Sequence, residues 1–417
     1  MTERVTNWAG NVVFAAKHVH RPTSVDEVRR LVSSGGPLRV LGSGHSFNRM
    51  ADTSGGLVVL SDLPRVVEVS ADRASVRIDG GIRYGELAPL LQSQGLALHN
   101  TASLPHISVA GAIATATHGS GARNANLATA VSSIELVTGD GSLITLDRDS
   151  PDFAGAVVHL GALGVITALT LDVQPTFDIR QYVYDDIPRA SISTSLLDML
   201  ADGYSVSLFT DWKGLDANMA WLKRRADDPI SGDWFGAHPA DGPRHPVPGM
   251  PAANSTEQHG VPGPWHTRLP HFRMEFTPSS GEELQSEYHV ARSDAPAAID
   301  AVAAIREQIA PVLQVCEIRS IAADHLWLSP NFERDSVALH FTWIPDTDAV
   351  LPVVGAVEAQ LAPLAARPHW GKVFTTAPAS LRTLFPRLSD FASLVARFDP
   401  AGTFRNQWLD AVLGPDA

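Results

Sequence analysis

Apolar and polar positions follow two different patterns along this chain, and the change falls near residue 176. In the first part, apolar residues at helical spacing follow Ser24, which forms a capping box with Glu27. A second helical stretch spans Tyr84–Gln94, where Pro89 is compatible with a helix only near the first turn. A third helix is expected to begin at Ser150-Pro151-Asp152. Short apolar runs predict strands at Pro37–Leu41, Leu57–Leu60, Val66–Val69, Ser75–Ile78 and Val165–Val173.

The second part of the chain is richer in strands. One helix is expected at Ala297–Ile309, where apolar residues recur at helical spacing. Asp227–Pro270 is crowded with Pro, Gly and His, so little of it can be regular. It is either a functional loop over a site or a surface excursion, and its length favours the loop. The runs that predict a sheet covered on one face are Tyr204–Thr210, His271–Thr277, Val312–Ile321, Ser336–Ile344 and Val373–Thr375.

Length and composition indicate a globular protein of more than one domain. The chain has 417 residues, which exceeds the roughly 250–300 residues that one core usually supports. Hydrophobic residues make up 44% and charged residues 18%, enough for packed cores. The net charge of −13 argues against nucleic acid or an anionic membrane as a partner, whereas a small neutral substrate is compatible with it.

Several features indicate where the protein resides. The lone cysteine, Cys316, excludes an intramolecular disulfide framework and fits a reducing compartment. The N-terminus lacks a basic region followed by an apolar run, so no signal peptide is expected. No apolar stretch approaches the roughly 18 residues that a membrane helix requires. We therefore expect a soluble, cytoplasmic protein.

The segment Arg39–Asn48, R-V-L-G-S-G-H-S-F-N, is a short strand that opens into a glycine-bracketed loop. Gly42 and Gly44 allow the backbone to turn sharply and bring its N–H groups near an anion. Phe47 stands where a G-x-G-x-x-G fingerprint needs its third glycine, and no Walker sequence follows. His45 is either a turn histidine or, held in a pyrophosphate loop, a point of attachment to the cofactor itself.

A second tract of small residues, Ala102–Gly121, lies in the same part of the chain. Its small side chains permit close backbone approach to a flat ligand, and its hydroxyls can bind phosphate or ring edges. Alone, the tract could equally be a tightly packed helix or strand. Together with the loop around His45, it favours a large dinucleotide ligand.

In the second part, charged residues interrupt the apolar strands. Val315, Glu317 and Arg319 share one face by the period of two, as do His340 and Thr342 in a later strand. Lys372 lies in H-W-G-K-V-F between two aromatic residues. Buried charges are costly unless they are paired, so these groups either form a structural network or hold a hydroxyl-rich substrate. The two interpretations are compatible.

Two other kinds of site are disfavoured. Five histidines in or beside the irregular segment have no tight cluster or i,i+4 spacing, so no metal site is expected; they are His238, His245, His259, His266 and His271. A serine hydrolase is excluded because the chain has no G-x-S-x-G elbow.

Taken together, the motifs resemble those of the alditol oxidases, also called xylitol oxidases, in the vanillyl-alcohol-oxidase superfamily of flavoproteins. The resemblance covers nearly the full length, in order, and G-V-P-G-P-W and S-L-F-T-D-W support it. H-W-G-K alone would be weak, since aldonolactone oxidases share it. The motifs are R-V-L-G-S-G-H-S-F-N, S-L-P-H-I-S-V-A-G, T-H-G-S-G, C-E-I-R, H-W-G-K and D-P-A-G-T-F.

The resemblance implies an α+β fold with an FAD-binding domain of two subdomains. A mixed or antiparallel sheet in an α+β substrate-binding domain would cover the flavin. The implied divisions are 1–175 for the FAD domain, 176–375 for the substrate domain, and 376–417 for a segment that returns to the FAD domain. FAD would be attached covalently through His45. The residues implied around the cofactor are Leu41, Gly42, Ser43, Gly44, His45, Ser46, Ser103, Ser108, Gly111, Thr115, Ala116, Thr117, His118 and Ile166.

The resemblance also implies oxidation of the terminal primary alcohol of an alditol, with hydride passing from C1 to flavin N5 and oxygen giving hydrogen peroxide. Arg319 is always charged, so it can stabilise an alkoxide but cannot be the base. Lys372 can do the same, or act as the base if burial lowers its pKa. Glu317 can hold Arg319, and His340 is another candidate base. The residues implied to face the substrate are Ser103, Glu317, Arg319, His340, Thr342 and Lys372.

Three alternatives remain open on the sequence. An aldonolactone oxidase would use the same scaffold. A dehydrogenase would pass electrons to an acceptor other than oxygen, and Ala102, beside the flavin's reactive edge in this superfamily, also occurs in dehydrogenases. A non-catalytic sugar- or flavin-binding protein fits poorly with charges in apolar strands. We expect a monomer with a small polyol and oxygen as its partners.

Overall fold

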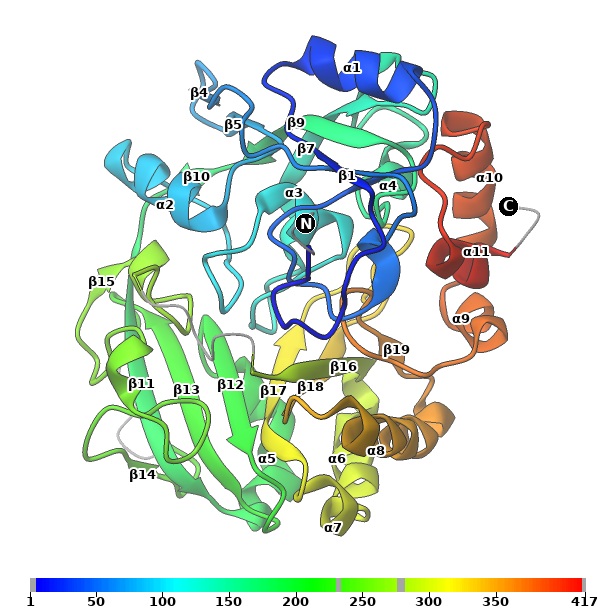
Figure 1. Ribbon diagram of the computed structural model, residues 1–417. Helices are drawn as coiled ribbons and strands as arrows, with labels where there is room; N and C mark the ends of the chain where they lie inside the picture. The colour runs from blue at the N-terminus through cyan, green and yellow to red at the C-terminus, as the bar shows by residue number, and fades with distance from the viewer. Residues whose placement is uncertain (1–4, 230–233, 276–281, 415–417) are drawn as a thin grey trace.

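The computed structural model describes residues 5–229, 234–275 and 282–414. Its strands form small sheets in the first part of the chain and one large sheet in the second (Figure 1). The three-stranded parallel sheet is β1 (His18–His20), β3 (Gly56–Val58) and β2 (Leu38–Val40). The five-stranded antiparallel sheet is β4 (Val67–Val69), β5 (Ser75–Asp79), β9 (Val165–Asp172), β7 (Val131–Val137) and β8 (Leu143–Asp147). A short antiparallel pair joins β6 (Leu96–Ala97) and β10 (Gln174–Pro175).

The large sheet is antiparallel and has nine strands. Its order is β14 (His238–Pro239), β11 (Asp178–Ile187), β13 (Ala217–Arg225), β12 (Ser205–Thr210), β17 (Leu313–Ile321), β18 (Ser336–Trp343), β16 (Leu284–Ala291) and β19 (Arg367–Pro368), with β15 (Gly263–Pro264) pairing on β11. The helices are α1 (Val25–Ser33), α2 (Tyr84–Ser93), α3 (Val109–Ala114), α4 (Phe153–Ala156), α5 (Arg189–Ala201), α6 (Ala295–Ala303), α7 (Arg306–Ile309), α8 (Thr347–Leu361), α9 (Pro378–Leu384), α10 (Leu388–Phe398) and α11 (Gln407–Leu413).

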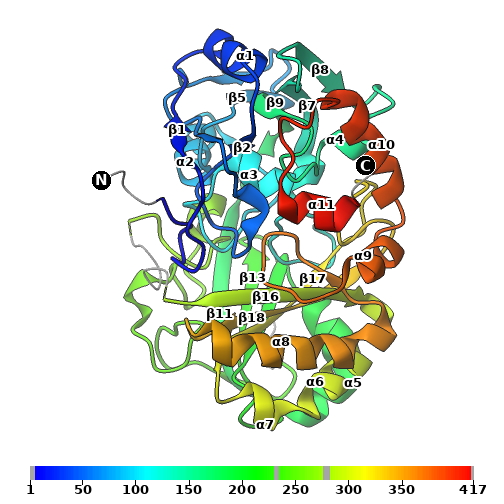
Figure 2. The same ribbon diagram turned by 45° about the vertical axis from the view of Figure 1, so that its right-hand side comes forward.

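Helices cover one face of the large sheet, and the other face meets the first part of the chain. Apolar side chains of α5, α6 and α8 share a core with the side chains Cys316, Ile318, Leu339 and Phe341 of β17 and β18. In Figure 2 these helices lie on the outer side of the sheet. The C-terminal helices α9, α10 and α11 instead join the core of the first part of the chain, on the side where α4 lies (Figure 2).

Most of the elements expected in the first part are present. The helices α1 and α2 agree with the predictions, as do β2, β4, β5 and β9, while β3 ends two residues earlier than expected. Ser24 caps α1 by accepting from the Glu27 N–H at 3.2 Å, but the Glu27 carboxylate binds Thr23 rather than Ser24. Pro89 lies in the interior of α2 rather than its first turn, and it is tolerated there on the exposed face, where water can bind the freed carbonyl.

Four expectations about elements were wrong. The helix expected from Ser150 begins only at Phe153, because the Ser150 hydroxyl binds Asp147 instead of capping the turn. The helix expected over Ala297–Ile309 is interrupted at Ile305, whose backbone leaves the helical region, and forms α6 and α7. Val373–Thr375 forms no strand.

His271–Thr277 also fails as a strand. Its described part, residues 271–275, has only an isolated bridge at Phe272, and the rest lies outside the described residues. Asp227–Pro270 is irregular, as expected, apart from two-residue strands and short 3-10 turns in its described part. No helix among the described residues is long and apolar enough to span a bilayer.

Candidate active site

The glycine loop after β2 is held against the segment that carries Lys372. The N–H of Phe47 donates to the Gly371 carbonyl at 2.8 Å, and the Asn48 side chain donates to the carbonyls of Trp370 and Lys372 at 2.7 and 2.9 Å. Two sequence motifs more than 300 residues apart, at 39–48 and at 369–372, therefore form one wall.

His45 lies at the tip of this loop. Gly44, with φ +74°, adopts a conformation that few other residues tolerate, and it turns the chain into His45. The imidazole stacks on Trp8 at 4.9 Å between ring centroids, and its Nδ1 lies 3.1 Å from the Ser43 carbonyl. Burial, and then the charge of Lys372, lowers the pKa of His45 to about 4. The ring is therefore neutral at neutral pH, the form in which one nitrogen carries a lone pair.

The tract of small residues approaches the loop from the other side. A Cβ on Gly42 would lie 2.3 Å from the Ser108 hydroxyl, so any other residue there would displace that hydroxyl. The N–H of Ser108 donates to the Ser43 hydroxyl at 3.1 Å. The Ser108 hydroxyl itself is buried and has no hydrogen-bond partner among the described residues. This is the arrangement expected of a site that receives polar groups from a ligand.

A single cavity of about 490 Å³ joins this cradle to the polar face of the large sheet. Of the residues expected around a cofactor, Ala116 is the exception, because its side chain is buried in the core rather than exposed to the cavity. The lining residues that match the expectation are Leu41, Gly42, Ser43, Gly44, His45, Ser46, Ser103, Ser108, Gly111, Thr115, Thr117, His118 and Ile166. Those expected to face substrate also line it: Ser103, Glu317, Arg319, His340, Thr342 and Lys372.

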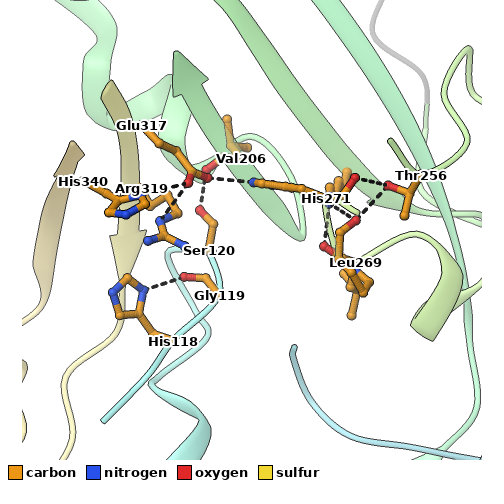
Figure 3. A network of polar contacts seen from close by, with 12 residues as sticks. His118, Gly119, Ser120, Val206, Thr256, Leu269, His271, Glu317, Arg319 and His340 are labelled. Atoms are coloured by element: carbon orange, nitrogen blue, oxygen red, sulfur yellow. Dashed lines mark hydrogen bonds and ion pairs between the residues drawn. The ribbon is translucent and has the colours of Figure 1, made fainter. Parts of the chain in front are cut away.

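The polar wall comes from the alternation in β17 and β18. Glu317 pairs with His340 across the two strands, so both side chains lie on the face opposite the helices. Figure 3 shows Glu317, Arg319 and His340 converging there, with His271 approaching Glu317 from the other side. His271 Nε2 donates to Glu317 Oε1 at 2.8 Å, and the second oxygen, Oε2, lies 3.6 Å from Arg319 Nε.

A second carboxylate, Glu287 of β16, completes the grip on Arg319. Arg319 Nη2 donates to Glu287 Oε1 at 2.6 Å, and both side chains are almost fully buried. Burial alone would raise the pKa of Glu287, but the Arg319 charge and then His118 hold that pKa well below its usual value. The same balance, with Arg319 and His271, lowers the pKa of Glu317. Both acids are therefore ionised at neutral pH.

Lys372 faces the same wall, and its charge, unlike that of Arg319, can change near neutral pH. Its Nζ donates to Gln285 Oε1 and lies 5.1 Å from the Phe47 ring centroid. Burial lowers the pKa of Lys372 to about 8, and Glu287 opposes that effect. His340 Nε2 donates to the same Gln285 oxygen at 3.1 Å, and burial lowers the pKa of His340.

Sequence reasoning missed several residues of this wall, most of them on strands that it did not predict. Glu283, Gln285 and Glu287 alternate with apolar positions before and along β16, and this period of two was available in the sequence. His271 was expected to begin a strand that does not form, and Lys223 lies on the unpredicted strand β13. Neither carries a local signal, because only tertiary contacts bring them to Glu317.

One group among the described residues has metal-ligand geometry: His118, Glu287 and His289. The Glu287 oxygen already binds the Arg319 guanidinium, so a cation is present there without a metal. Of the five histidines weighed for metal binding, His245 and His271 line the cavity.

Comparison with known proteins identifies two families along the chain. Residues 16–147 match the FAD binding domain family, and residues 280–412 match the D-arabinono-1,4-lactone oxidase family. The cradle around His45 lies in the first match and the wall around Arg319 in the second.

Two relatives extend over nearly the whole chain. The alditol oxidase of a Streptomyces species is 52% identical over 99% of this chain and 100% of its own length. The L-gulono-1,4-lactone dehydrogenase of Mycobacterium tuberculosis is 30% identical over 98% of this chain and 99% of its own length.

Solved structures share the fold at low sequence identity. The cholesterol oxidase of B. sterolicum has a TM-score of 0.79 and 15% identity, covering 98% of this chain and 96% of its own. A solvent-stable cholesterol oxidase has a TM-score of 0.80 and 16% identity, covering 98% and 97%. These values confirm the expected α+β flavoprotein fold, in which the antiparallel sheet covers the cofactor cradle.

Proposed function

Because this chain belongs to the alditol oxidase family of FAD-dependent oxidoreductases, we propose that it oxidises the terminal primary alcohol of alditols such as xylitol or sorbitol to the aldose, with oxygen reduced to hydrogen peroxide. The observation that carries the proposal is the single cavity in which the cradle of the FAD-binding domain faces the wall formed by Glu317, Arg319 and Lys372. The charged and amide groups of this wall can form hydrogen bonds with the hydroxyls that a polyol carries along its short carbon chain.

The cradle fits a flavin dinucleotide. Gly42 lets Ser108 and the loop backbone approach a phosphate or ring edge, and the unpartnered Ser108 hydroxyl supplies a donor. We further propose that His45 attaches the flavin covalently, since its buried ring is neutral and therefore nucleophilic. When bound, the flavin supplies the hydride acceptor, at N5, and passes the electrons on to oxygen.

The residues of the wall would manage charge. Arg319, fixed between two carboxylates, would stabilise the substrate oxygen as its proton leaves, and Lys372 would bind the same oxygen or its neighbour. Ser103 and Thr342 would orient the remaining hydroxyls. His340, or Lys372 in its neutral form, would accept the hydroxyl proton, because Arg319 cannot.

A second candidate function is oxidation of an aldonolactone. The match of residues 280–412 to the D-arabinono-1,4-lactone oxidase family favours it, and that segment carries the polar wall. A dehydrogenase is the third possibility, supported by the name of the Mycobacterium tuberculosis relative. Ala102, buried beside the cavity, is the position at which access of oxygen to the flavin would be decided.

Other features belong to the same proposal. The chain would act as a monomer in the cytoplasm, where the single buried Cys316 would stay reduced. Its FAD domain would comprise residues 1–175 and its substrate domain 176–375. The segment 376–417, whose helices pack into the core of the first part, would complete the FAD domain.

Anaerobic titration of the purified, flavin-loaded protein tests the substrate. Xylitol or sorbitol should bleach the visible flavin band, whereas L-gulono-1,4-lactone should leave it unchanged. Bleaching by the lactone alone would favour the second function, and bleaching by neither would indicate a binding protein. Comparing oxygen with a dye acceptor then separates an oxidase from a dehydrogenase.

Mass spectrometry tests the attachment. A tryptic peptide spanning His45 should be heavier by one FAD, and acid-precipitated protein should stay yellow. His45→Ala should release any flavin it still binds. An unmodified peptide from the flavin-loaded protein would contradict the covalent link.

A further inference from the structure

Each carboxylate that grips Arg319 is backed by an imidazole, but the two imidazoles have opposite partners on their far sides. His118 Nε2 lies 3.1 Å from Glu287 Oε1, and its Nδ1 lies 2.8 Å from the Gly119 carbonyl. A carboxylate and a carbonyl only accept hydrogen bonds, so both ring nitrogens of His118 face acceptors.

His271 makes the same pairing with Glu317 and is neutral. Its Nε2 donates to Glu317 Oε1 at 2.8 Å, while its Nδ1 lies 3.2 Å from the Lys223 ammonium. An ammonium only donates, so Nδ1 must accept and carries no proton. Burial, then Lys223, lowers the pKa of His271 to about 4, in agreement with this assignment. The difference between the two imidazoles is the presence of Lys223.

Lys223 is buried, and its ammonium group is occupied by hydrogen bonds on all sides. It lies on β13 and is 1% exposed. Its three protons meet three acceptors: the carbonyls of Leu269 and Pro270 and the ring nitrogen of His271. The ammonium therefore reaches the reaction site only through His271.

We infer that Lys223 is a positioning residue for the oxidation of polyols, an inference that rests on the proposed function. Its ammonium holds His271 in the single tautomer that donates to Glu317. Glu317 thereby stays ionised, with its other oxygen, Oε2, facing Arg319 at 3.6 Å and His340 at 3.7 Å. The substrate oxygen then meets an Arg319 whose orientation is fixed from both sides.

This device should respond to pH. Burial lowers the pKa of Lys223 to about 7, and Glu317 partly opposes that effect. The groups facing this pair are Glu317 and Arg319 on β17 and the Trp221 ring, 5.8 Å from the ammonium, on β13. A neutral amine can accept as well as donate, so His271 can then adopt the tautomer whose Nε2 lone pair faces Glu317. The positioning should weaken as the pH rises through about 7.

Rates of flavin reduction by xylitol, measured anaerobically across pH, provide the first test. Lys223→Met should lower the rate about ten- to hundredfold at about pH 6, as expected for a misplaced catalytic group, and should abolish the step near pH 7. Lys223→Arg, which stays charged, should retain the rate and lack the step. Lys213→Met is the matched control, since that lysine is exposed and its ion-pair partner in the described part of the chain is Asp211.

A double-mutant cycle separates positioning from simple bracing of the loop at Leu269 and Pro270. His271→Gln supplies an amide donor that has no tautomers. In that background Lys223→Met should change the rate less than about twofold, because coupled residues are non-additive. If the double variant instead loses the product of the two separate rate decreases, the two residues act independently and the inference is wrong.

The inference can also fail independently of the proposed function. If xylitol does not reduce the wild-type flavin, the proposed function is wrong. The tautomer is then tested by ¹⁵N NMR, assigned by comparison with His271→Gln. Wild type should show a protonated Nε2 on His271 below about pH 7, and Lys223→Met should lose that single state. An unchanged ring would overturn the inference.

Discussion

Lys372 illustrates how a single residue can carry opposite consequences for activity and for stability. Burial lowers its pKa from an ordinary 10.5 to about 8, so between these values the unfolded chain binds more protons than the folded one. Stability therefore rises with pH across that window. The positive charge by which Lys372 is proposed to bind the substrate oxygen is, in contrast, lost as the pH rises through about 8.

The first prediction follows from this loss. The value of kcat/KM for xylitol should fall above about pH 8, beyond the separate step assigned to Lys223. Lys372→Arg should move the fall to higher pH, because a guanidinium stays charged. A pH profile of the free enzyme measures both. If Lys372 is instead the base, kcat/KM should rise above pH 8, which would refute the proposal that Lys372 acts as a cation.

The place of an individual residue could be predicted from the sequence where it follows from the pattern of its neighbours along the chain. The face shared by Glu317 and Arg319 follows from the period of two, and the structure has both on the polar face of β17. Their partners were not readable. Glu287 and His271 meet them across strands and loops, and no local pattern encodes such contacts.

At the level of elements, the loop after β2 and the start of α3 form the cradle proposed for the cofactor. The loop and α3 approach so closely that the side chain of Ser108 fills the space a Cβ would need. This closeness is what brings the loop amides and the Ser108 hydroxyl to one place.

The second prediction concerns this contact. Gly42→Ala should displace Ser108, lower the flavin content of the purified protein, and destabilise it by about 1–3 kcal/mol through overpacking. The absorbance ratio at the flavin and protein bands, with urea unfolding, measures both effects.

Gly355→Ala in α8 is the matched control. The nearest atom to its new Cβ would be Thr375 Oγ1 at 3.7 Å, so it should retain flavin and gain about 0.5–1 kcal/mol from helix propensity. Equal flavin contents in the two variants would contradict the cradle.

Elements were predicted well where a local signal was strong and poorly where packing decided. The capped helix α1 and the apolar strands β9, β12 and β17 agree with the sequence patterns. The helix expected over Ala297–Ile309 breaks at Ile305, and helical spacing alone cannot report such a break. The strand β16 was missed because its many polar residues suit a wall rather than a core.

For the whole molecule, the return of the chain to its first part is secured by Asn406. Its side-chain oxygen caps α11 by accepting from the Leu409 N–H at 2.8 Å. Its nitrogen donates to the carbonyls of Arg49, Met50 and Asp52 at 2.8–3.2 Å, directly after the glycine loop. One amide thus joins the C-terminal helix to the flavin cradle.

The third prediction tests this link. Asn406→Ala should lower the free energy of unfolding by about 2–4 kcal/mol, combining a lost cap with carbonyls left without a donor. Flavin content should fall as well. Asp346→Ala, which removes only the cap of α8, is the control and should cost about 1 kcal/mol. Equal losses would mean that the bonds to residues 49–52 contribute nothing.

The sequence by itself indicated a dinucleotide ligand, the loop that presents His45, and the charged residues of the polar strands, because glycines at fixed spacing and period-two alternation act locally. Only the tertiary structure decided which charges pair. Glu287 binds Arg319, both ring nitrogens of His118 face acceptors, and the far nitrogen of His271 instead faces the Lys223 ammonium, which leaves His271 neutral. The physical reason is that a buried group takes its charge from its surroundings, and here those surroundings come from segments far apart in the chain.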